Sequence, residues 1–479
     1  MRAFLLFFLA SFVLAAPHGA AAQARPAQAR RPRPDAARYA APLPASETAL
    51  WITDIHLNPY SVPGLVPRLE RAPLRRWRRL WLAALRRHAA VGHRHPYGRY
   101  GQDSNARLFD SALDAMRQAD PHPAFIVVTG DLLAHGFHRH FLVASPRHAA
   151  ADYQAFVQRM FRYVVLRLRA AFPYTPMLPA LGNNDSDCGD YQTRPGAPFM
   201  TAAAAAWAGV LPGGARTARQ FAAAGYYSVL LPAPGAAPPL RAIVLNDVLW
   251  SSYYRNRCGS PLDARAGNEE MRWLDATLYA AALRHERVWV AAHIPPGADV
   301  FTTLRHASNL CAAPPVLFLA SRYNRRLTAL LAQYPGLVRL GLFGHTHQDE
   351  FRFDAGVPLK IAPALSPIFG NNPAFTLLRL AGGRALDYRV YRLDLAAAHP
   401  SWREEYDFDQ AYRASALAAL AALPARLRAA PAARRRFQRF YNVGSLAPNF
   451  SRLAWPDFAC GIARLTPAAF RRCVCPAKK

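Results

Sequence analysis

Seven side chains in this sequence have the chemistry of divalent-metal ligands, and each comes shortly after a short apolar run. They are Asp54, His56, Asp131, Asn183, His293, His345 and His347. Carboxylate oxygens, amide oxygens and imidazole nitrogens are common ligands of divalent metals in proteins. Two such ions about 3.5 to 4 Å apart neutralise the oxygens of a phosphate ester and generate hydroxide from water at neutral pH. The set therefore predicts a hydrolytic site with two metal ions.

Single members of this set carry little information, whereas their combination carries much. An Asp-x-His pair such as Asp54 and His56 is close to chance, and Gly130-Asp131 is a common turn. His293 alone is typical of a buried, hydrogen-bonded histidine. Five such groups in series, each at the end of an apolar run, are much harder to explain by accident. Asp131 is the natural bridge between two ions because a carboxylate has two oxygens.

The apolar runs themselves predict the elements that position these groups. Six β-prone runs end abruptly in polar or turn residues, at 49–53, 125–129, 177–181, 241–245, 288–292 and 338–343. Loops at the carboxyl ends of strands are where α/β sheets gather their sites. Helical patterns lie between several runs, and one of them aligns Leu108, Phe109, Ala112, Leu113 and Met116. This alternation predicts an α/β fold, with one large domain over residues 47–395.

The two ends of the chain differ from this pattern. Met1-Arg2, the apolar run 3–16 and the small residues up to Ala22 predict a signal peptide over 1–24. A membrane anchor is the alternative, but the run is shorter than the ~20 residues of a spanning helix. We therefore expect export to the periplasm or the extracellular space. Residues 25–46, rich in Ala, Pro and Arg, predict a disordered linker, and residues 396–479 predict a small helical subdomain with a break at Pro424.

The cysteines fit an exported chain, because disulfides persist in oxidising compartments. There are six, at positions 188, 258, 311, 460, 473 and 475. None lies in a CxxC pair, so pairing is favoured over thiolate metal binding. We expect Cys258 to pair with Cys311, and Cys460 to pair with Cys473 or Cys475.

The net charge of +29 comes almost entirely from arginine and fits an anionic substrate, an anionic membrane or nucleic acid. Arginine is abundant even in the linker, so the charge supports an anionic partner only weakly, and no nucleic-acid partner is expected. Residues 74–87 place Leu and Trp side chains among arginines. Two interpretations stay open: a basic helix lying on an anionic membrane, or a surface helix that packs Trp77 and Trp81 onto the sheet.

Taken together, the motifs resemble the metallophosphoesterase family, also called calcineurin-like phosphoesterases, over about residues 48–392. That family shows Asp-x-His, Gly-Asp, Gly-Asn-His-Asp/Glu, a lone His and Gly-His-x-His in this order. Four segments look closer to its acid sphingomyelinase-like phosphodiesterase branch: 52–60, 293–297, 344–351 and 366–373. The resemblance implies a four-layer α-β-β-α sandwich. It also implies two divalent ions, with zinc as the usual metal and manganese or iron as alternatives.

The resemblance further implies a role for each residue. One ion would be held by Asp54, His56, Asp131 and His347, and the other by Asp131, Asn183, His293 and His345. The family's histidine after the ligand asparagine is Asn184 here. We expect Asn184 to act at the catalytic site, where a neutral amide can hydrogen-bond phosphate but cannot donate a proton as imidazolium does. His135, four residues past Asp131, stands where the branch carries a histidine near the leaving group. We expect His135 to be the proton donor; an exposed loop histidine is the alternative.

Three functions compete at this point. The resemblance favours a sphingomyelinase-like enzyme that hydrolyses phosphodiester or phosphomonoester bonds. The Gly-Asn-Asn-Asp sequence at 182–185 also resembles endopolyphosphatases, which makes polyphosphate or nucleotides alternative substrates. A non-catalytic exported protein that binds metal and phosphate is the alternative of another class, and Asn184 favours it. The oligomeric state stays open.

Overall fold

The computed structural model describes residues 48–90, 95–231, 238–255, 264–306, 311, 314–381, 384–413, 417–445 and 455–475. These residues belong to one compact unit, Tyr39–Lys479. The predicted signal peptide and linker, residues 1–46, lie outside the described ranges. None of the helices within those ranges combines the length and hydrophobicity needed to cross a bilayer.

The first sheet has the strand order β12-β11-β10-β1-β2-β3. Its parallel part holds β1 (Thr48–Ile52), β2 (Ile126–Val128) and β3 (Met177–Pro179). Its antiparallel part holds β10 (Ala374–Ala381), β11 (Arg384–Leu393) and β12 (Trp402–Asp407). The parallel strands are buried, apolar runs, as sheets covered on both faces require.

The second sheet has the order β4-β5-β6-β7-β9-β8. Its central strands are parallel: β5 (Leu240–Val244), β6 (Arg287–Ala291), β7 (Val338–Phe343) and β9 (Val357–Ile361). The antiparallel edges are β4 (Tyr227–Leu231) and β8 (Glu350–Asp354).

Alternation along β6 shows how the layers stack. Trp289 and Ala291 belong to the core shared with the first sheet, and Trp289 meets Phe125 edge-on at 5.9 Å between ring centroids. Val288 and Val290 point the other way, into a second core with the helices on the outer face. Because successive strand residues face opposite sides of a sheet, β6 lies between two buried layers. The predicted four-layer sandwich is confirmed.

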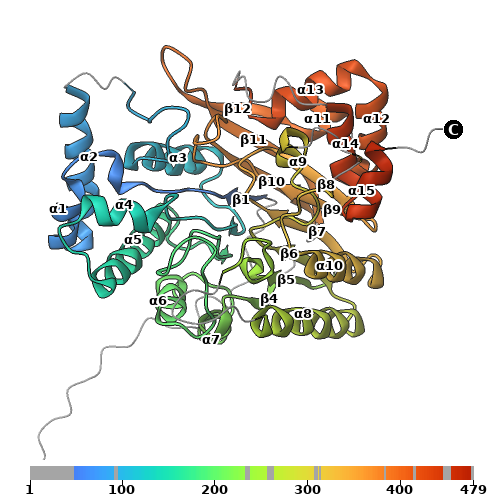
Figure 1. Cartoon of the computed structure of the whole chain (residues 1–479), viewed down its shortest axis with the longest axis horizontal. Coiled ribbons are helices and arrows are strands. Elements are labelled where there is room, and N and C mark those ends of the chain that lie inside the picture. Colours follow the sequence, from blue (N-terminus) through green and yellow to red (C-terminus); the bar gives the residue numbers. More distant parts are fainter. Residues whose placement is uncertain are drawn as a thin grey trace, which may run out of the picture. The chain divides into compact units, whose positions relative to one another are not determined.

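Helices cover the outer face of each sheet (Figure 1). Those between β1 and β4 are α1 (Leu65–Arg71), α2 (Leu74–Ala90), α3 (Ala106–Ala119), α4 (Phe137–Ala144), α5 (Ala150–Ala171), α6 (Pro198–Trp207) and α7 (Gly214–Ala224). Of these, α3 packs on β10 of the first sheet. The second sheet is covered by α8 (Arg265–Leu283) and α10 (Ser321–Gln333), and the short α9 (Val300–His306) lies between β6 and α10 in the chain.

Helix α2 contains the Leu- and Trp-rich segment for which two interpretations were open. Trp77 and Trp81 are fully buried in the protein core. The Trp77 indole N–H donates to the carbonyl of Ala72, and the Arg159 guanidinium lies 5.0 Å from the ring. The structure therefore supports packing onto the protein, and these two rings are not available to a membrane.

The segment predicted as a separate helical subdomain, 396–479, begins with a strand of the main sheet. β12 pairs with β11, so the boundary placed at residue 395 cuts the first sheet. The expected helices follow it: α11 (Phe408–Tyr412), α12 (Leu423–Ala429), α13 (Pro431–Tyr441), α14 (Trp455–Ala463) and α15 (Pro467–Val474). Phe437, Phe458 and Phe470 from these helices join the same core as the first sheet.

Two disulfides tie the C-terminal helices. Cys460 pairs with Cys473, as predicted. Cys311 pairs with Cys475, so the predicted Cys258–Cys311 bond is wrong. Cys311 and Cys475 lie 164 residues apart in sequence, and such a contact depends on the fold rather than on local spacing. Cys258 lies outside the described residues.

Candidate metal centre

The seven predicted ligands come together where strands of both sheets end. The first sheet supplies those that follow β1, β2 and β3, and the second supplies those that follow β6 and β7. All are buried except His345, which is half-buried. The structure thus brings together Asp54, His56, Asp131, Asn183, His293, His345 and His347.

Five of these residues have left-handed backbone dihedrals, which residues other than glycine rarely adopt. φ is 48° at Asp54, 42° at His56, 54° at Asp131, 74° at His345 and 64° at His347. Such dihedrals cost on the order of 1–3 kcal/mol each and persist where the surroundings enforce them. They curl the loops, so that residues i and i+2 approach one point instead of standing roughly 6.6 Å apart along a strand.

Two glycines allow the loops to approach this closely. A Cβ added at Gly182 would lie 2.6 Å from Asp131 Cγ, and one added at Gly344 would lie 2.6 Å from Asp54 Oδ2. Any side chain at these positions would push a carboxylate out of place. Steric crowding therefore explains why glycine precedes Asn183 and His345.

One cluster of donor atoms forms around His56. Its Nε2 lies 3.4 Å from Asp131 Oδ2, 3.7 Å from Asp54 Oδ1 and 3.1 Å from His347 Nε2. His347 Nε2 in turn lies 3.5 Å from Asp54 Oδ1. These are the four residues that the resemblance assigns to one ion.

A second cluster forms around His293. Its Nε2 lies 3.2 Å from Asp131 Oδ2, 3.0 Å from Asn183 Oδ1 and 3.3 Å from His345 Nδ1. The same oxygen of Asp131 therefore takes part in both clusters. This position suits a carboxylate that bridges two ions.

Hydrogen bonds on the far side of the rings orient two of the imidazoles. Nδ1 of His56 donates to the Leu133 carbonyl at 2.8 Å, and Nδ1 of His293 donates to the Thr129 carbonyl at 2.7 Å. These bonds fix the tautomer that leaves Nε2 with its lone pair, as in metal-ligating histidines.

The electrostatics of the centre also fit cations. Among the described residues, no Lys or Arg forms an ion pair with the buried carboxylates of Asp54 and Asp131. Burial would raise the pKa of Asp54, but its interactions with His347, His56 and His293 hold the pKa well below the usual range. The four imidazoles fall into two pairs. Burial lowers the pKa of His345 and of His347 to about 3. Burial would also lower the pKa of His56 and His293, but the charge of Asp131 raises them to about 9 and about 10. The buried carboxylates thus draw positive charge into the centre, and metal ions, which bind neutral imidazole, would supply that charge when bound.

Two buried aspartates, Asp185 in the loop after β3 and Asp247 after β5, hold the ligand loops from behind. Asp185 accepts from the Leu132 N–H at 2.8 Å and from the Gly182 N–H at 3.0 Å. Asp247 accepts from the His293 N–H at 3.2 Å and from the Ile294 N–H at 2.9 Å. Burial raises the pKa of each to about 7. Each lies in a short polar segment directly after an apolar run. This pattern is the sequence feature from which both could have been identified.

Asn184 lies beneath the centre rather than in the pocket. Its side-chain NH₂ donates to Asp131 Oδ2 at 2.8 Å, and its backbone N–H donates to Asp131 Oδ1 at 2.7 Å. The residue is only 5% exposed. In this structure the amide holds the shared carboxylate, a role different from the phosphate contact expected from the sequence.

His135 lies at the edge of the centre. Its ring stacks on His56, with 3.9 Å between ring centroids and 20° between the planes. Nδ1 of His135 donates to Asp103 Oδ1 at 3.0 Å, and its backbone N–H donates to Asp103 Oδ2 at 2.9 Å. Burial would raise the pKa of Asp103, but the bond from His135 and the charge of His56 lower it to about 2. Sequence reasoning missed Asp103, which lies in a loop without a motif.

The nitrogen atoms of His56, His135 and His347 also lie within 4.8 Å of one another. An imidazole lone pair lies in the plane of its ring, and the rings of His56 and His135 are stacked. Their lone pairs therefore lie in separate, nearly parallel planes and do not converge on one ion. This geometry separates His135 from the metal ligands.

A pocket of about 750 Å³ opens over the centre. Its walls include the rings of Tyr191, Phe318 and Phe369. Phe369 is 47% exposed and meets the His347 ring edge-on, with 4.6 Å between centroids. Arg305 is the one Lys or Arg side chain among the described residues that line the pocket. The described part of this pocket thus has little basic character beyond its histidines, although the chain as a whole is strongly basic.

The model of the calcineurin-like phosphoesterase family matches residues 48–349, which include all seven predicted ligands, His135 and Asn184. Sphingomyelinase phosphodiesterase D of Dictyostelium discoideum is 27% identical over 338 residues, covering 66% of this chain and 67% of that protein. Acid sphingomyelinase-like phosphodiesterase 3b of Mus musculus is 27% identical over 66% of this chain and 68% of its own length. Cyclic GMP-AMP phosphodiesterase SMPDL3A of Mus musculus is 26% identical over 75% of this chain and 76% of its own length.

Proposed function

This chain belongs to the calcineurin-like phosphoesterase family, and from that premise we propose that it is an exported phosphodiesterase working with two divalent metal ions. The position of Asp131 carries this proposal, since one of its oxygens lies 3.4 Å from His56 Nε2 and 3.2 Å from His293 Nε2. A carboxylate shared in this way suits a centre with two ions. Export is supported by the two disulfides of the C-terminal helices, because such bonds persist outside reducing compartments.

The donor atoms of the two clusters fit divalent ions in number and chemistry. Asp54, His56, Asp131 and His347 would hold one ion; Asp131, Asn183, His293 and His345 would hold the other. Zinc suits this mixture of imidazole, carboxylate and amide ligands, and manganese or iron are the alternatives. Two bound ions would supply charge neutralisation at the phosphate oxygens and activation of water.

The proton for the leaving group comes, in this proposal, from His135. Because Nδ1 of His135 is bonded to Asp103, Nε2 is the nitrogen left to face the pocket that His135 lines. Protonated at Nε2, the ring donates to the leaving oxygen as the phosphorus–oxygen bond breaks, which general acids of this kind accelerate by about 10² to 10⁴. Asp103 orients the ring through its bonds to Nδ1 and to the backbone N–H of His135.

The pocket walls favour a substrate with an organic group over inorganic polyphosphate. A polyanion requires several cationic side chains along its length, and the described pocket residues offer only Arg305. Aromatic side chains such as Phe318 and Phe369 contribute by burying apolar or planar surface. We therefore propose phosphodiesters with an organic substituent as the substrates. Sphingomyelin-like lipids and cyclic dinucleotides come first, following the activities that the names of the relatives state.

A substrate panel on purified, metal-loaded protein tests this function. Bis(p-nitrophenyl) phosphate, sphingomyelin in mixed micelles, a cyclic dinucleotide and polyphosphate would each be assayed with added zinc or manganese. We expect turnover of at least one organic diester, abolished by chelation and restored by metal. Turnover of polyphosphate alone would refute the substrate proposal. Tight metal binding without turnover of any ester would favour the non-catalytic alternative.

A further inference from the structure

Arg352 is a buried arginine at a junction of three chain segments. It lies on β8, three residues after Asp349, and is 1% exposed. Its Nη1 donates to the carbonyl of Gly461 at 2.7 Å, and its Nη2 donates to the carbonyl of Ala298 at 3.1 Å. Glu350 Oε2 lies 3.2 Å from Nη2 and balances the charge. A planar guanidinium can reach two carbonyls and a carboxylate at once, which an ammonium on a flexible stem does less well.

The two carbonyls belong to different parts of the molecule. Ala298 lies just before α9, whose residues Val300, Phe301, Thr302 and Arg305 line the substrate pocket. Gly461 lies on α14, one of the C-terminal helices. Arg352 therefore connects the start of a pocket wall to a helix more than 100 residues away in sequence.

Helix α14 also presses directly against that wall. A Cβ added at Gly461 would overlap Val300 Cγ2 and would lie 2.8 Å from Arg352 Nη1. Only a glycine lets the α14 backbone come this close to the Val300 and Arg352 side chains without a shift. The contact fixes where α9 begins relative to the pocket.

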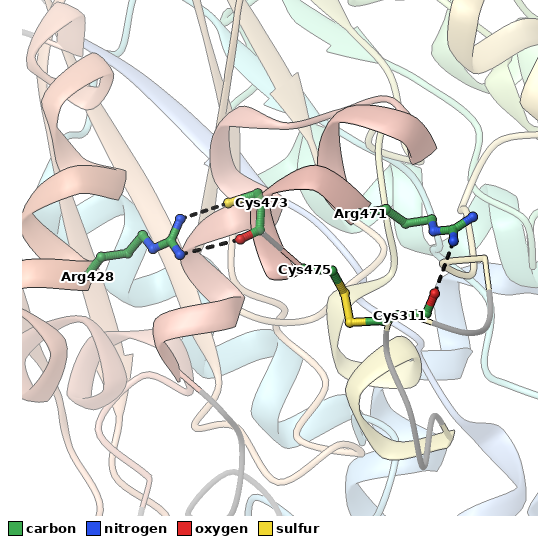
Figure 2. Close-up of a disulfide and its surroundings, with 5 residues drawn as sticks. All are labelled: Cys311, Arg428, Arg471, Cys473 and Cys475. Carbon is green, nitrogen blue, oxygen red and sulfur yellow. Dashed lines mark hydrogen bonds between the residues drawn. A yellow bond between two sulfur atoms is a disulfide. The ribbon is translucent and has the colours of Figure 1, made fainter. Parts of the chain in front are cut away.

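Covalent bonds hold the same group of elements (Figure 2). Cys311, which follows α9 in the chain, is bonded to Cys475 at the end of α15, and Nη2 of Arg471 donates to the Cys311 carbonyl at 3.0 Å. The second disulfide joins Cys473 to Cys460, the neighbour of Gly461. Helices α14 and α15 and the segment beyond α9 thus form one tethered group.

Another C-terminal residue lies in the pocket itself. Tyr441, at the end of α13, lines the pocket, and its carbonyl accepts from the Asp349 N–H at 2.8 Å. Asp349 comes two residues after the predicted ligand His347. Arg352, Tyr441 and Gly461 all lie beyond the residues 48–349 that match the family model.

We propose that the C-terminal helices are a built-in support of the substrate pocket, in which Arg352 positions α9 by anchoring it to Gly461 of α14. Arg352 does not itself line the pocket, although its ion-pair partner Glu350 does, and it is a positioning residue. The inference rests on the proposed phosphodiesterase function. In this proposal, the pocket wall formed by α9 contacts the organic group of the substrate and not the scissile phosphate.

Two substitutions disturb this junction from opposite sides. Arg352→Lys keeps the charge beside Glu350 but cannot reproduce the pair of carbonyl contacts. Gly461→Ala keeps Arg352 and places a methyl group where Val300 lies, and alanine is the better helix former. Gly267→Ala is the matched control, because this glycine also lies within a helix, α8, and an added Cβ would lie 2.6 Å from Tyr323 Oη.

KM and kcat for bis(p-nitrophenyl) phosphate, bound metal, and hydrogen exchange of α9 would be measured for each variant. We expect Arg352→Lys and Gly461→Ala each to raise KM about tenfold with kcat within about twofold, since misplacement by about 1 Å at a positioning element can cost up to 10². Metal content should stay at the wild-type level. Exchange of the α9 amides should accelerate in both variants and not in Gly267→Ala.

Unchanged α9 exchange in both variants would overturn the proposal, and so would an equal rise in KM for Gly267→Ala. Loss of metal with unchanged KM would assign Arg352 to the metal centre instead. If the wild-type protein binds metal but turns over no ester, the proposed function fails. The α9 exchange then still decides whether the C-terminal helices support this wall.

Discussion

The loops that carry the metal ligands and the walls of the substrate pocket are built in different ways. Each ligand loop is tied to the loop at the end of the neighbouring strand: the Asp54 N–H donates to the Gly130 carbonyl at 3.0 Å, and the His56 N–H donates to the Asp131 carbonyl at 2.9 Å. The walls are fixed from far away. Helix α9 depends on Arg352 and on contacts with α14, and Phe369 lies in a loop before β10.

This difference predicts which kinetic constant a substitution in each region will change. A change in a ligand loop should lower kcat and metal content, because it alters groups that act on the reacting phosphate. A change in a wall should raise KM and leave kcat, because it alters contacts made equally before and during the reaction. The predictions below test that division, starting with the largest effect.

Asp131→Asn should lower kcat by at least about 10³, the upper end of what losing one electrostatic group costs. The amide keeps the size of the side chain and removes the charge shared by the two donor clusters. Activity and bound metal would be measured together, and we expect both to fall. Asp114→Asn, at an exposed position on α3, is the control. Full activity in Asp131→Asn would refute a two-ion mechanism.

His135→Ala should lower kcat about 10²-fold for a diester with a poor leaving group, since general acids contribute 10² to 10⁴. The loss should be much smaller for p-nitrophenolate, which departs without a proton. A series of aryl phosphodiesters with leaving groups of increasing pKa measures this dependence. His138→Ala removes an exposed histidine three residues away and should change nothing. Equal losses across the series would contradict the acid role.

Asp103→Asn should lower kcat about tenfold for the same poor leaving group, because residues that orient a functional imidazole typically contribute 10- to 100-fold. The amide still occupies the site beside Ser366, whose hydroxyl donates to Asp103 Oδ1 at 3.0 Å. In a double-mutant cycle with His135→Ala, the substitution should have no further effect. An additive loss would mean that Asp103 acts through something other than His135.

The same contrast explains what the sequence predicted well. Ligand types and strand ends are local features. The apolar runs and the polar segments after them were therefore enough to place the seven predicted ligands at strand ends. The two-sheet sandwich followed from the family resemblance. The left-handed φ values of His345 and His347 were beyond prediction, because enforced backbone strain has no signature in a single residue type.

Features that depend on distant contacts were missed or mistaken. Asp103 reaches His135 from a loop 32 residues earlier, and Cys311 meets Cys475 across 164 residues. The open question about Trp77 and Trp81 was likewise one of tertiary packing, since an amphipathic helix has the same periodicity on a membrane and on a protein. Strand β12 was hidden because its edge position tolerates the charged sequence Arg403-Glu404-Glu405.

Phe369→Ala should raise KM for an organic diester about fivefold and leave kcat and metal content unchanged. About half of the ring is exposed, and covering about 40 Å² of that exposed surface with substrate is worth roughly 1 kcal/mol at 25 cal/mol per Å² of apolar surface. Initial rates with bis(p-nitrophenyl) phosphate measure it, and Tyr279→Ala, an exposed ring on α8, is the control. This is the smallest effect and the sharpest test, because the ring touches His347 at 4.6 Å between centroids. If kcat and metal content fall instead, Phe369 supports the ligand loop, and the boundary between loop and wall must be moved to include it.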